Sequence, residues 1–154
     1  MRFPLLVILL SFLFISCEEE DNSPFYVAKN GVTIKARDWV TVGTTGDLNG
    51  VTYTAVDSLM LHDWIDSGKD YGKAVTTLVT RFRPMLISHL ATQRGLEFPV
   101  QSITYNIETW DVSNIEVYDC PFYATAIDQD LSGWDLSNAT HLSLCADLNN
   151  VDPR

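Results

Sequence analysis

Residues that can act as catalysts or metal ligands are few and scattered in this chain of 154 residues. The three histidines, His62, His89 and His141, each stand alone, with no second histidine or cysteine at the spacing that a zinc site needs. The sequence also contains none of the short motifs of serine hydrolases, zinc proteases or phosphate-binding loops. It therefore gives no support to an enzyme, and we predict no catalytic residue, no metal and no cofactor.

Repeated acidic residues suggest calcium binding as a second kind of chemistry. Two stretches of the sequence, residues 103–114 and 127–138, are similar to each other, and we call them the two copies of a repeated phrase. Asp111 and Asp135 occupy matching places in the two copies, and Asp128 and Asp130 lie near Asp135 in the second copy. Calcium requires several oxygen ligands that converge on one point, and the chain lacks the dense Gly-Asp repeat of calcium-binding β-rolls. Turn capping and solubility explain these acids better, and calcium stays the weaker alternative.

The distance in sequence between Cys120 and Cys145 is one position longer than the distance between matching residues of the two copies. An exported protein meets an oxidising environment, so a Cys120–Cys145 disulfide is compatible with the sequence. The two cysteines are not strictly equivalent, because they follow the serines of their copies by seven and eight positions. A one-residue offset reverses the side of a strand but matters less in a turn. Two free thiols are the alternative.

The first residues combine a positive charge with an apolar run. Arg2 precedes a mostly apolar stretch from Phe3 to Ile15, a secretory signal pattern that is shorter than the roughly 20 residues needed to span a bilayer. "FISC" resembles the lipobox of bacterial lipoproteins, in which a small residue such as Ser16 precedes the lipidated cysteine, here Cys17. The resemblance implies a signal peptide at 1–16 and a lipid anchor at Cys17, in the outer membrane or at the cell surface. Ordinary cleavage near Ser16, with Cys17 as a free thiol, is the alternative.

Charge is distributed unevenly along the rest of the chain. Residues 17–24 contain an acidic run that is expected to be a solvated tether, since like charges repel and cannot form a core. No Lys or Arg lies between Arg94 and Arg154, whereas residues 101–153 carry nine Asp and Glu. Nucleic acid is therefore excluded as a partner, because affinity for phosphate backbones depends on Lys and Arg. Residues 28–94 carry eight basic and six acidic side chains, so two regions are indicated.

The first region, residues 25–75, is predicted to be a capping unit that begins with a hairpin. Asn30-Gly31 lies between two alternating apolar runs, which is a strong hairpin signal. We therefore expect antiparallel strands at 25–28 and 32–36.

The same region continues with a second turn and a helix. Asn49-Gly50 predicts the turn, and the β-branched residues and tyrosine of 51–56 predict a strand after it. Asp57 or Ser58 can then cap a helix. The apolar face of this helix consists of Leu61, Trp64 and Ile65.

The second region, residues 76–154, contains the repeated phrase. "ITYNIETWDVSN" at 103–114 aligns with "IDQDLSGWDLSN" at 127–138. Self-similarity at a fixed period of about 20 to 50 residues indicates stacked units that cover one another's apolar faces. "LSGWDL" is short and bounded by turn residues, so it is expected to be a brief strand, with the two indoles stacked and sealed from water. The predicted repeat core consists of Ile107, Trp110, Val112, Phe122, Leu131, Trp134 and Leu136.

Polar residues of the phrase are predicted to cap a helical turn that follows this strand, by accepting hydrogen bonds from backbone N–H groups. A weaker copy begins at 78–86. Because Val79 and Ile115 are further apart in sequence than matching positions of the two full copies, an insertion is expected within 87–99. The predicted capping residues are Asp111, Ser113, Asp135 and Ser137.

These patterns resemble the BspA-like bacterial surface lipoproteins, whose repeats of roughly 25 residues are related to leucine-rich repeats. "IDQDLSGWDLSNATHL" at 127–142 is similar to the family phrase "FNQDLSGWDVSNVTNM", and "TWDVSNI" at 109–115 matches its centre. The resemblance implies an α+β fold, in which a small N-terminal cap of β-sheet and helix precedes a short leucine-rich-repeat-like solenoid of about two to three coils.

The same resemblance implies a surface-exposed lipoprotein without enzymatic activity, which acts as an adhesion module. Its partner would be a host or neighbouring-cell protein. A short array offers little contact area, which favours weak or multivalent binding. The alternative is a structural or accessory cell-envelope lipoprotein, such as a truncated remnant of a repeat array, with no dedicated ligand.

Overall fold

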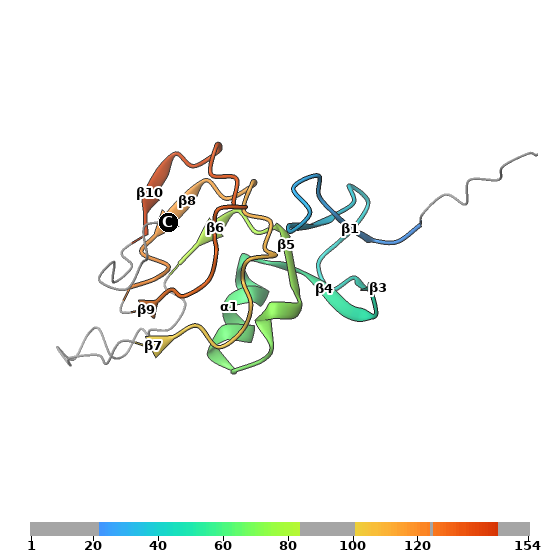
Figure 1. The fold of residues 1–154 in the computed structure, drawn as a ribbon, viewed down its shortest axis with the longest axis horizontal. Helices are drawn as coiled ribbons and strands as arrows, with labels where there is room; N and C mark the ends of the chain where they lie inside the picture. The colour runs from blue at the N-terminus through green and yellow to red at the C-terminus, as the bar shows by residue number, and fades with distance from the viewer. Residues whose placement is uncertain (1–21, 84–100, 124, 145–154) are drawn as a thin grey trace, which may run out of the picture.

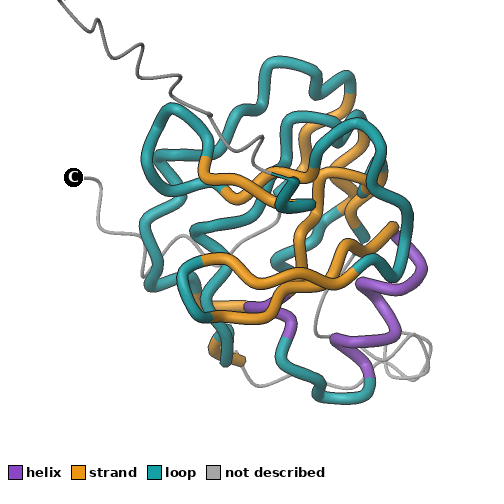
Figure 2. Tube along the Cα trace, turned by 90° about the vertical axis from the view of Figure 1, so that its right-hand side faces the viewer, coloured by secondary structure: helices purple, strands orange, loops and turns teal. Residues whose placement is uncertain are grey.

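The computed structural model describes residues 22–83, 101–123 and 125–144 (Figure 1). Within these ranges the chain forms small sheets of two or three strands, one α-helix and one 3-10 helix. The predicted α+β fold with a leucine-rich-repeat-like solenoid is therefore wrong, because the described chain is mostly sheet with a single α-helix. Figure 2 shows short strands joined by long loops, with the helix confined to one side of the molecule.

The N-terminal hairpin is confirmed. Strand β1 (Phe25–Val27) pairs antiparallel with β2 (Ile34–Ala36). Asn30 stabilises the turn between them, because its Oδ1 accepts hydrogen bonds from the N–H groups of Val32 and Thr33 at 3.1 and 3.0 Å. The local signal at Asn30-Gly31 was sufficient to predict this element.

The second turn and its strand are also confirmed. Strand β3 (Thr45–Leu48) pairs antiparallel with β4 (Val51–Asp57). Asn49 and Gly50 between them have φ angles of 53° and 80°, which is the left-handed conformation that Asn-Gly favours in a two-residue hairpin turn. On its other side β4 pairs in parallel with β5 (Ala74–Leu78).

Helix α1 (Ser58–Asp66) connects β4 to the 3-10 helix η1 (Tyr71–Lys73). Of the two predicted capping residues, Asp57 has this role, since its Oδ1 accepts a hydrogen bond from the N–H of Met60 at 2.8 Å. The predicted apolar face is buried and consists of Leu61, Trp64 and Ile65.

Parallel pairing joins the copies of the repeat. Strands β6 (Arg81–Phe82), β8 (Val117–Asp119) and β10 (His141–Ser143) form one sheet, with Arg81 opposite Val117 and Val117 opposite His141. The first of these pairs has the longer spacing predicted for the weaker copy, and the second has the spacing of the repeated phrase. Strands β7 (Gln101–Ser102) and β9 (Thr125–Ala126) also pair in parallel at the spacing of the phrase. The insertion predicted at 87–99 lies outside the described residues.

The strand predicted for "LSGWDL" is wrong. Residues 131–136 form turns, in which the N–H of Trp134 donates to the carbonyl of Leu131 at 3.0 Å and that of Ala139 to Leu136 at 3.0 Å. Aspartate side chains bind the N–H groups two residues further on, which favours turns over extended backbone. The strand of each copy begins several residues after the phrase, and no helical turn follows the phrase in either described copy.

A single apolar core joins the two predicted regions. Trp64 of α1 and Phe82 of β6 belong to the same cluster as Trp110 and Tyr118 of the repeats. The boundary predicted between residues 75 and 76 falls inside β5. A smaller cluster lies beneath the hairpin and consists of Phe25, Ile34, Ala36, Val40, Ala55 and Val75.

The ring of Phe82 lies at the centre of an aromatic cluster. Its centroid is 5.6 Å from that of Trp110 and 6.4 Å from that of Trp134, so both indoles of the repeat contact one phenyl ring. The rings of Tyr118 and Phe122 lie 6.2 and 5.8 Å away, in edge-to-face arrangements. Both indoles were expected to be sealed from water. Trp110 is buried, but Trp134 is only partly buried, so the expectation is wrong for Trp134.

Burial of Tyr118 predicts a loss of stability in alkaline solution. The side chain is buried, its hydroxyl donates to the carbonyl of Val112 at 3.3 Å, and burial together with Asp135 and Asp111 raises its pKa far above the usual value. Above pH about 10 the unfolded tyrosine loses its proton and the folded one keeps it, so the free energy of unfolding falls as pH rises.

Urea unfolding near pH 9 and pH 11 is expected to show a smaller decline for Tyr118→Phe than for the wild type. Tyr123→Phe is the matched control, because this tyrosine is exposed. Equal declines for the wild type and Tyr118→Phe would contradict the assignment.

Candidate functional site

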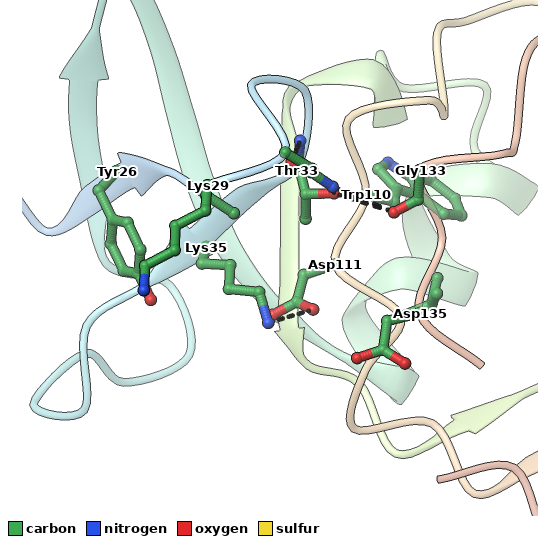
Figure 3. A pocket seen from close by; sticks show the side chains of 11 residues that line it. Tyr26, Lys29, Thr33, Lys35, Trp110, Asp111, Gly133 and Asp135 are labelled. Carbon is green, nitrogen blue, oxygen red and sulfur yellow. Dashed lines mark hydrogen bonds and ion pairs between the residues drawn. The ribbon is translucent and has the colours of Figure 1, made fainter. Parts of the chain in front are cut away.

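A cleft of about 410 Å³ lies between the β1–β2 hairpin and the repeated phrase (Figure 3). Tyr26, Lys29 and Lys35 line it from the hairpin, and Asp111 and Asp135 line it from the two copies of the phrase. Figure 3 shows the Lys35 side chain reaching across to the carboxylate of Asp111, with Asp135 beside it. The cleft therefore joins elements that are far apart in sequence.

Hydrogen bonds hold the hairpin against the repeats. The side-chain amide of Asn30 donates to the carbonyl of Gly133 at 3.1 Å, and the N–H of Ile34 donates to the carbonyl of Thr109 at 2.8 Å. Asn30 also donates to the hydroxyl of Thr33 at 2.8 Å, which couples the turn to β2. The two walls are thus fixed before any ligand arrives, which lowers the entropic cost of binding.

Asp111 forms the floor of the cleft and is 1% exposed. Its Oδ1 lies 3.2 Å from Nζ of Lys35 and accepts hydrogen bonds from the N–H and hydroxyl of Ser113 at 3.1 and 2.6 Å. Lys35 in turn donates to the Ser113 hydroxyl at 2.9 Å. Within the described part of the chain, the buried Oδ2 has no hydrogen-bond partner. A buried carboxylate needs a paired charge, and the hairpin supplies it.

Asp135 is the equivalent residue of the second copy, but it is exposed at the rim. Its Oδ1 accepts a hydrogen bond from the N–H of Ser137 at 3.0 Å. The hydroxyl and N–H of Ser137 lower the pKa of Asp135, and the nearby charge of Lys35 lowers it further. Asp135 is therefore ionised at neutral pH and accessible to a ligand.

The other predicted repeat residues lie in or against the core. The first-copy residues Ile107, Trp110 and Val112 are buried. Each indole N–H donates a hydrogen bond to a backbone carbonyl earlier in the chain. The Trp110 N–H donates to the carbonyl of Tyr71 at 3.1 Å, and the Trp134 N–H donates to the carbonyl of Ile107 at 3.2 Å. Phe122 is buried too, and the partly buried residues packed against this core include Leu131, Trp134 and Leu136.

Sequence reasoning missed the asparagine of the phrase. The amide of Asn138 donates to the carbonyl of Ser113 at 2.7 Å, and that of Asn114 donates to the carbonyl of Thr77 at 2.8 Å. Each asparagine thus ties its copy to the preceding one. Its occurrence at the same place in both copies was a signal that could have identified it.

Sequence reasoning also missed the hairpin wall of the cleft. No motif or repeat connects the hairpin to the phrase, and only the fold brings Tyr26, Lys29 and Lys35 to face Asp111 and Asp135.

Two predicted modification sites fall in or beside the undescribed parts of the chain. Cys17, with the leader at 1–16, lies outside the described residues. Cys120 is disulfide-bonded, but Cys145 lies outside the described residues, so the pairing of these two cysteines stays a prediction.

The residues described here include no group of three or more His, Cys, Asp and Glu that could hold a metal ion. Asp130, one of the acids considered for calcium, accepts a hydrogen bond from the N–H of Ser132 at 2.9 Å. The hydroxyl of Ser132 and then this N–H lower the pKa of Asp130. No helix in ranges 22–83, 101–123 and 125–144 has the length and apolar character to cross a bilayer.

Comparisons with known proteins found no matching family model, no matching curated protein and no matching solved structure.

Proposed function

We propose that this chain is a lipid-anchored cell-surface protein that binds a polypeptide partner in the cleft between the hairpin and the repeats. The observation that carries the proposal is the cleft itself. Its walls are held together by hydrogen bonds, its floor is the Lys35–Asp111 ion pair, and Asp135 stands exposed at its rim. The lipobox-like sequence before Cys17 supports the anchor, and the likeness of the repeated phrase to BspA-like surface lipoproteins supports membership of that class as part of the proposal.

A basic segment is the ligand that the charges favour. Lys35 and Asp111 neutralise each other, which leaves Asp135 as the accessible anion of the repeat wall and Lys29 as an exposed cation of the hairpin wall. Residues 101–144 carry seven Asp and Glu but no Lys or Arg, so this half of the protein attracts cations over a distance of about a Debye length. Tyr26 on the opposite wall has the guanidinium of Arg37 5.5 Å from its ring centroid, and its exposed part adds apolar surface that can contact the stem of a Lys or Arg side chain.

Surface display is tested by treating intact cells with a protease. Loss of the full-length protein from intact cells, together with an N-terminal peptide that begins at acylated Cys17, is the expected result. Protection of the protein in intact cells would place it on the inner side of the envelope and would favour the accessory alternative.

Binding is tested with the mature chain 17–154 and an array of synthetic peptides that differ in their number of Lys and Arg residues. Asp135→Asn is expected to weaken binding of the basic peptides about tenfold, because it removes the exposed anion of the cleft. The matched control is Asp119→Asn, which removes the same charge from an exposed position on β8 that does not line the cleft.

Equal losses for Asp135→Asn and Asp119→Asn would show that only net charge matters and would overturn the cleft as the site. Absence of binding to every peptide would remove the proposed ligand class.

A further inference from the structure

Two consecutive turns between β2 and β3 present exposed apolar side chains. The first turn is closed by a hydrogen bond from the N–H of Val40 to the carbonyl of Arg37 at 2.9 Å, and the second by one from Thr44 to Thr41 at 3.0 Å. Trp39 in the first turn is 59% exposed, and Val42 in the second is 45% exposed. We call Trp39 and Val42 the turn pair. Single exposed apolar residues are common on protein surfaces, so it is the position of the turn pair relative to the N-terminal segment that bears on what it contacts.

The turn pair is attached to the segment that leads back to Cys17. The N–H of Arg37 donates to the carbonyl of Pro24 at 3.0 Å, and its Nε donates to the carbonyl of Ser23 at 2.8 Å. Cys17 precedes Ser23 by six positions, which span at most roughly 22 Å when fully extended. A lipid on Cys17 would therefore hold the turn pair within reach of the bilayer surface.

The shape of the molecule fits this placement. In Figure 1 the described chain begins at the right-hand end, beside β1, whereas β8 and β10 lie at the opposite end. A membrane at the right-hand end would leave the repeats turned away from the lipid, with the cleft between the two ends. Acyl chains alone fix the position of a protein on a membrane, and a further contact is needed to fix its orientation.

We propose that Trp39 and Val42 insert into the interface of the membrane that holds Cys17, and so orient the domain with its cleft accessible. This inference rests on the proposed lipid anchor. Tryptophan prefers the headgroup region, where its ring is partly buried and its N–H stays hydrated. Asp38, which precedes Trp39, is exposed, and Arg37 beside it balances its charge. The acidic run at residues 18–21 disfavours strongly anionic bilayers. Zwitterionic lipid is thus the expected surface.

Quenching of tryptophan fluorescence by brominated phosphatidylcholine tests the insertion. The mature chain is coupled through Cys17 to a maleimide lipid in vesicles, so that anchoring does not depend on acylation in the cell. Wild-type emission is expected to be quenched, and Trp39→Phe is expected to lose most of this quenching, because Trp64 and Trp110 are buried and Trp134 is partly buried. Leu59→Ala, which removes an exposed apolar side chain from α1, is the matched control and is expected to keep wild-type quenching.

The outcomes separate this inference from the proposed function. Equal quenching of wild type and Trp39→Phe, or none in either, would overturn insertion by the turn pair even if Cys17 proves to be acylated in cells. Absence of acylation in cells, with quenching intact in the coupled protein, would overturn the anchor and leave the membrane affinity of the turn pair established.

Discussion

Trp110→Ala is expected to lower the free energy of unfolding by about 3–5 kcal/mol, the usual cost of deleting a large buried aromatic side chain. Trp110 is 1% exposed. Its ring lies 6.0 Å from that of Tyr71 and 5.6 Å from that of Phe82, and its N–H donates to the carbonyl of Tyr71. The substitution therefore leaves a cavity between η1, β6 and the repeats, and also leaves a buried carbonyl without its donor.

Urea unfolding followed by circular dichroism measures the change, with two tryptophan variants as references. Trp134→Ala is expected to cost less, because this indole is only partly buried. Trp39→Ala is expected to leave the midpoint near that of the wild type, because the side chain is exposed. A Trp110→Ala protein as stable as Trp39→Ala would mean that the repeats do not share a core with α1 and β6.

Local signals in the sequence predicted the local elements of the fold. Asn30-Gly31 and Asn49-Gly50 each specify a turn through the conformation that glycine permits, and Asp57 caps α1 through one side-chain hydrogen bond. All three depend on residues that are close in sequence, so no knowledge of tertiary packing was needed. The pairing distance between copies was also predicted, because the repeat period can be read from the sequence and the parallel strands of neighbouring copies pair at that distance.

The errors arose where a residue has two uses. Trp134 and Leu136 were assigned to a strand because the stretch is short, half apolar and bounded by turn residues, but Asp130 and Asp135 bind backbone N–H groups and turn the chain at both ends of it. The solenoid prediction came from the resemblance of the repeated phrase, whereas the described chain is mostly small sheets with a single α-helix. The front elements were expected to cap the repeats, and Trp64 of α1 lies in the same core as the repeats. The first error concerns local hydrogen bonds of the two aspartates, whereas the second concerns packing between distant segments, of which one sequence contains no signal.

Of the two walls of the candidate site, the sequence predicted residues of the repeat wall but not those of the hairpin wall. Asp111 and Asp135 were identified as acceptors for backbone N–H groups, and each has that contact. Their difference was not foreseen, because identical positions of a repeat give identical predictions. It is the hairpin that makes them different, by placing Lys35 against Asp111 and leaving Asp135 at the surface. A repeat can thus acquire a binding site when a non-repeated element covers only one of its copies.

Asp111→Ala is expected to lower the free energy of unfolding by about 2 kcal/mol. The change removes the acceptor of the N–H and hydroxyl of Ser113 and leaves the ammonium of Lys35 without its partner at the floor of the cleft. The full cost of breaking a buried ion pair is not expected, because the Lys35 side chain is 29% exposed and can turn toward water. Asp135→Ala, at the equivalent but exposed position, is expected to change the midpoint of unfolding little.

A double-mutant cycle with Lys35→Met separates the ion pair from the turn. If the two charges stabilise each other, the double variant is expected to lose less unfolding free energy than the two single variants lose together. The expected difference is about 1 kcal/mol or more. Strict additivity would assign the whole effect of Asp111 to its hydrogen bonds with Ser113. In that case the hairpin would still be held by Asn30, by the backbone bond of Ile34 and by the hydrogen bond from Lys35 to the Ser113 hydroxyl, among other contacts. The charge of Lys35 would then contribute little to the stability of the floor of the cleft.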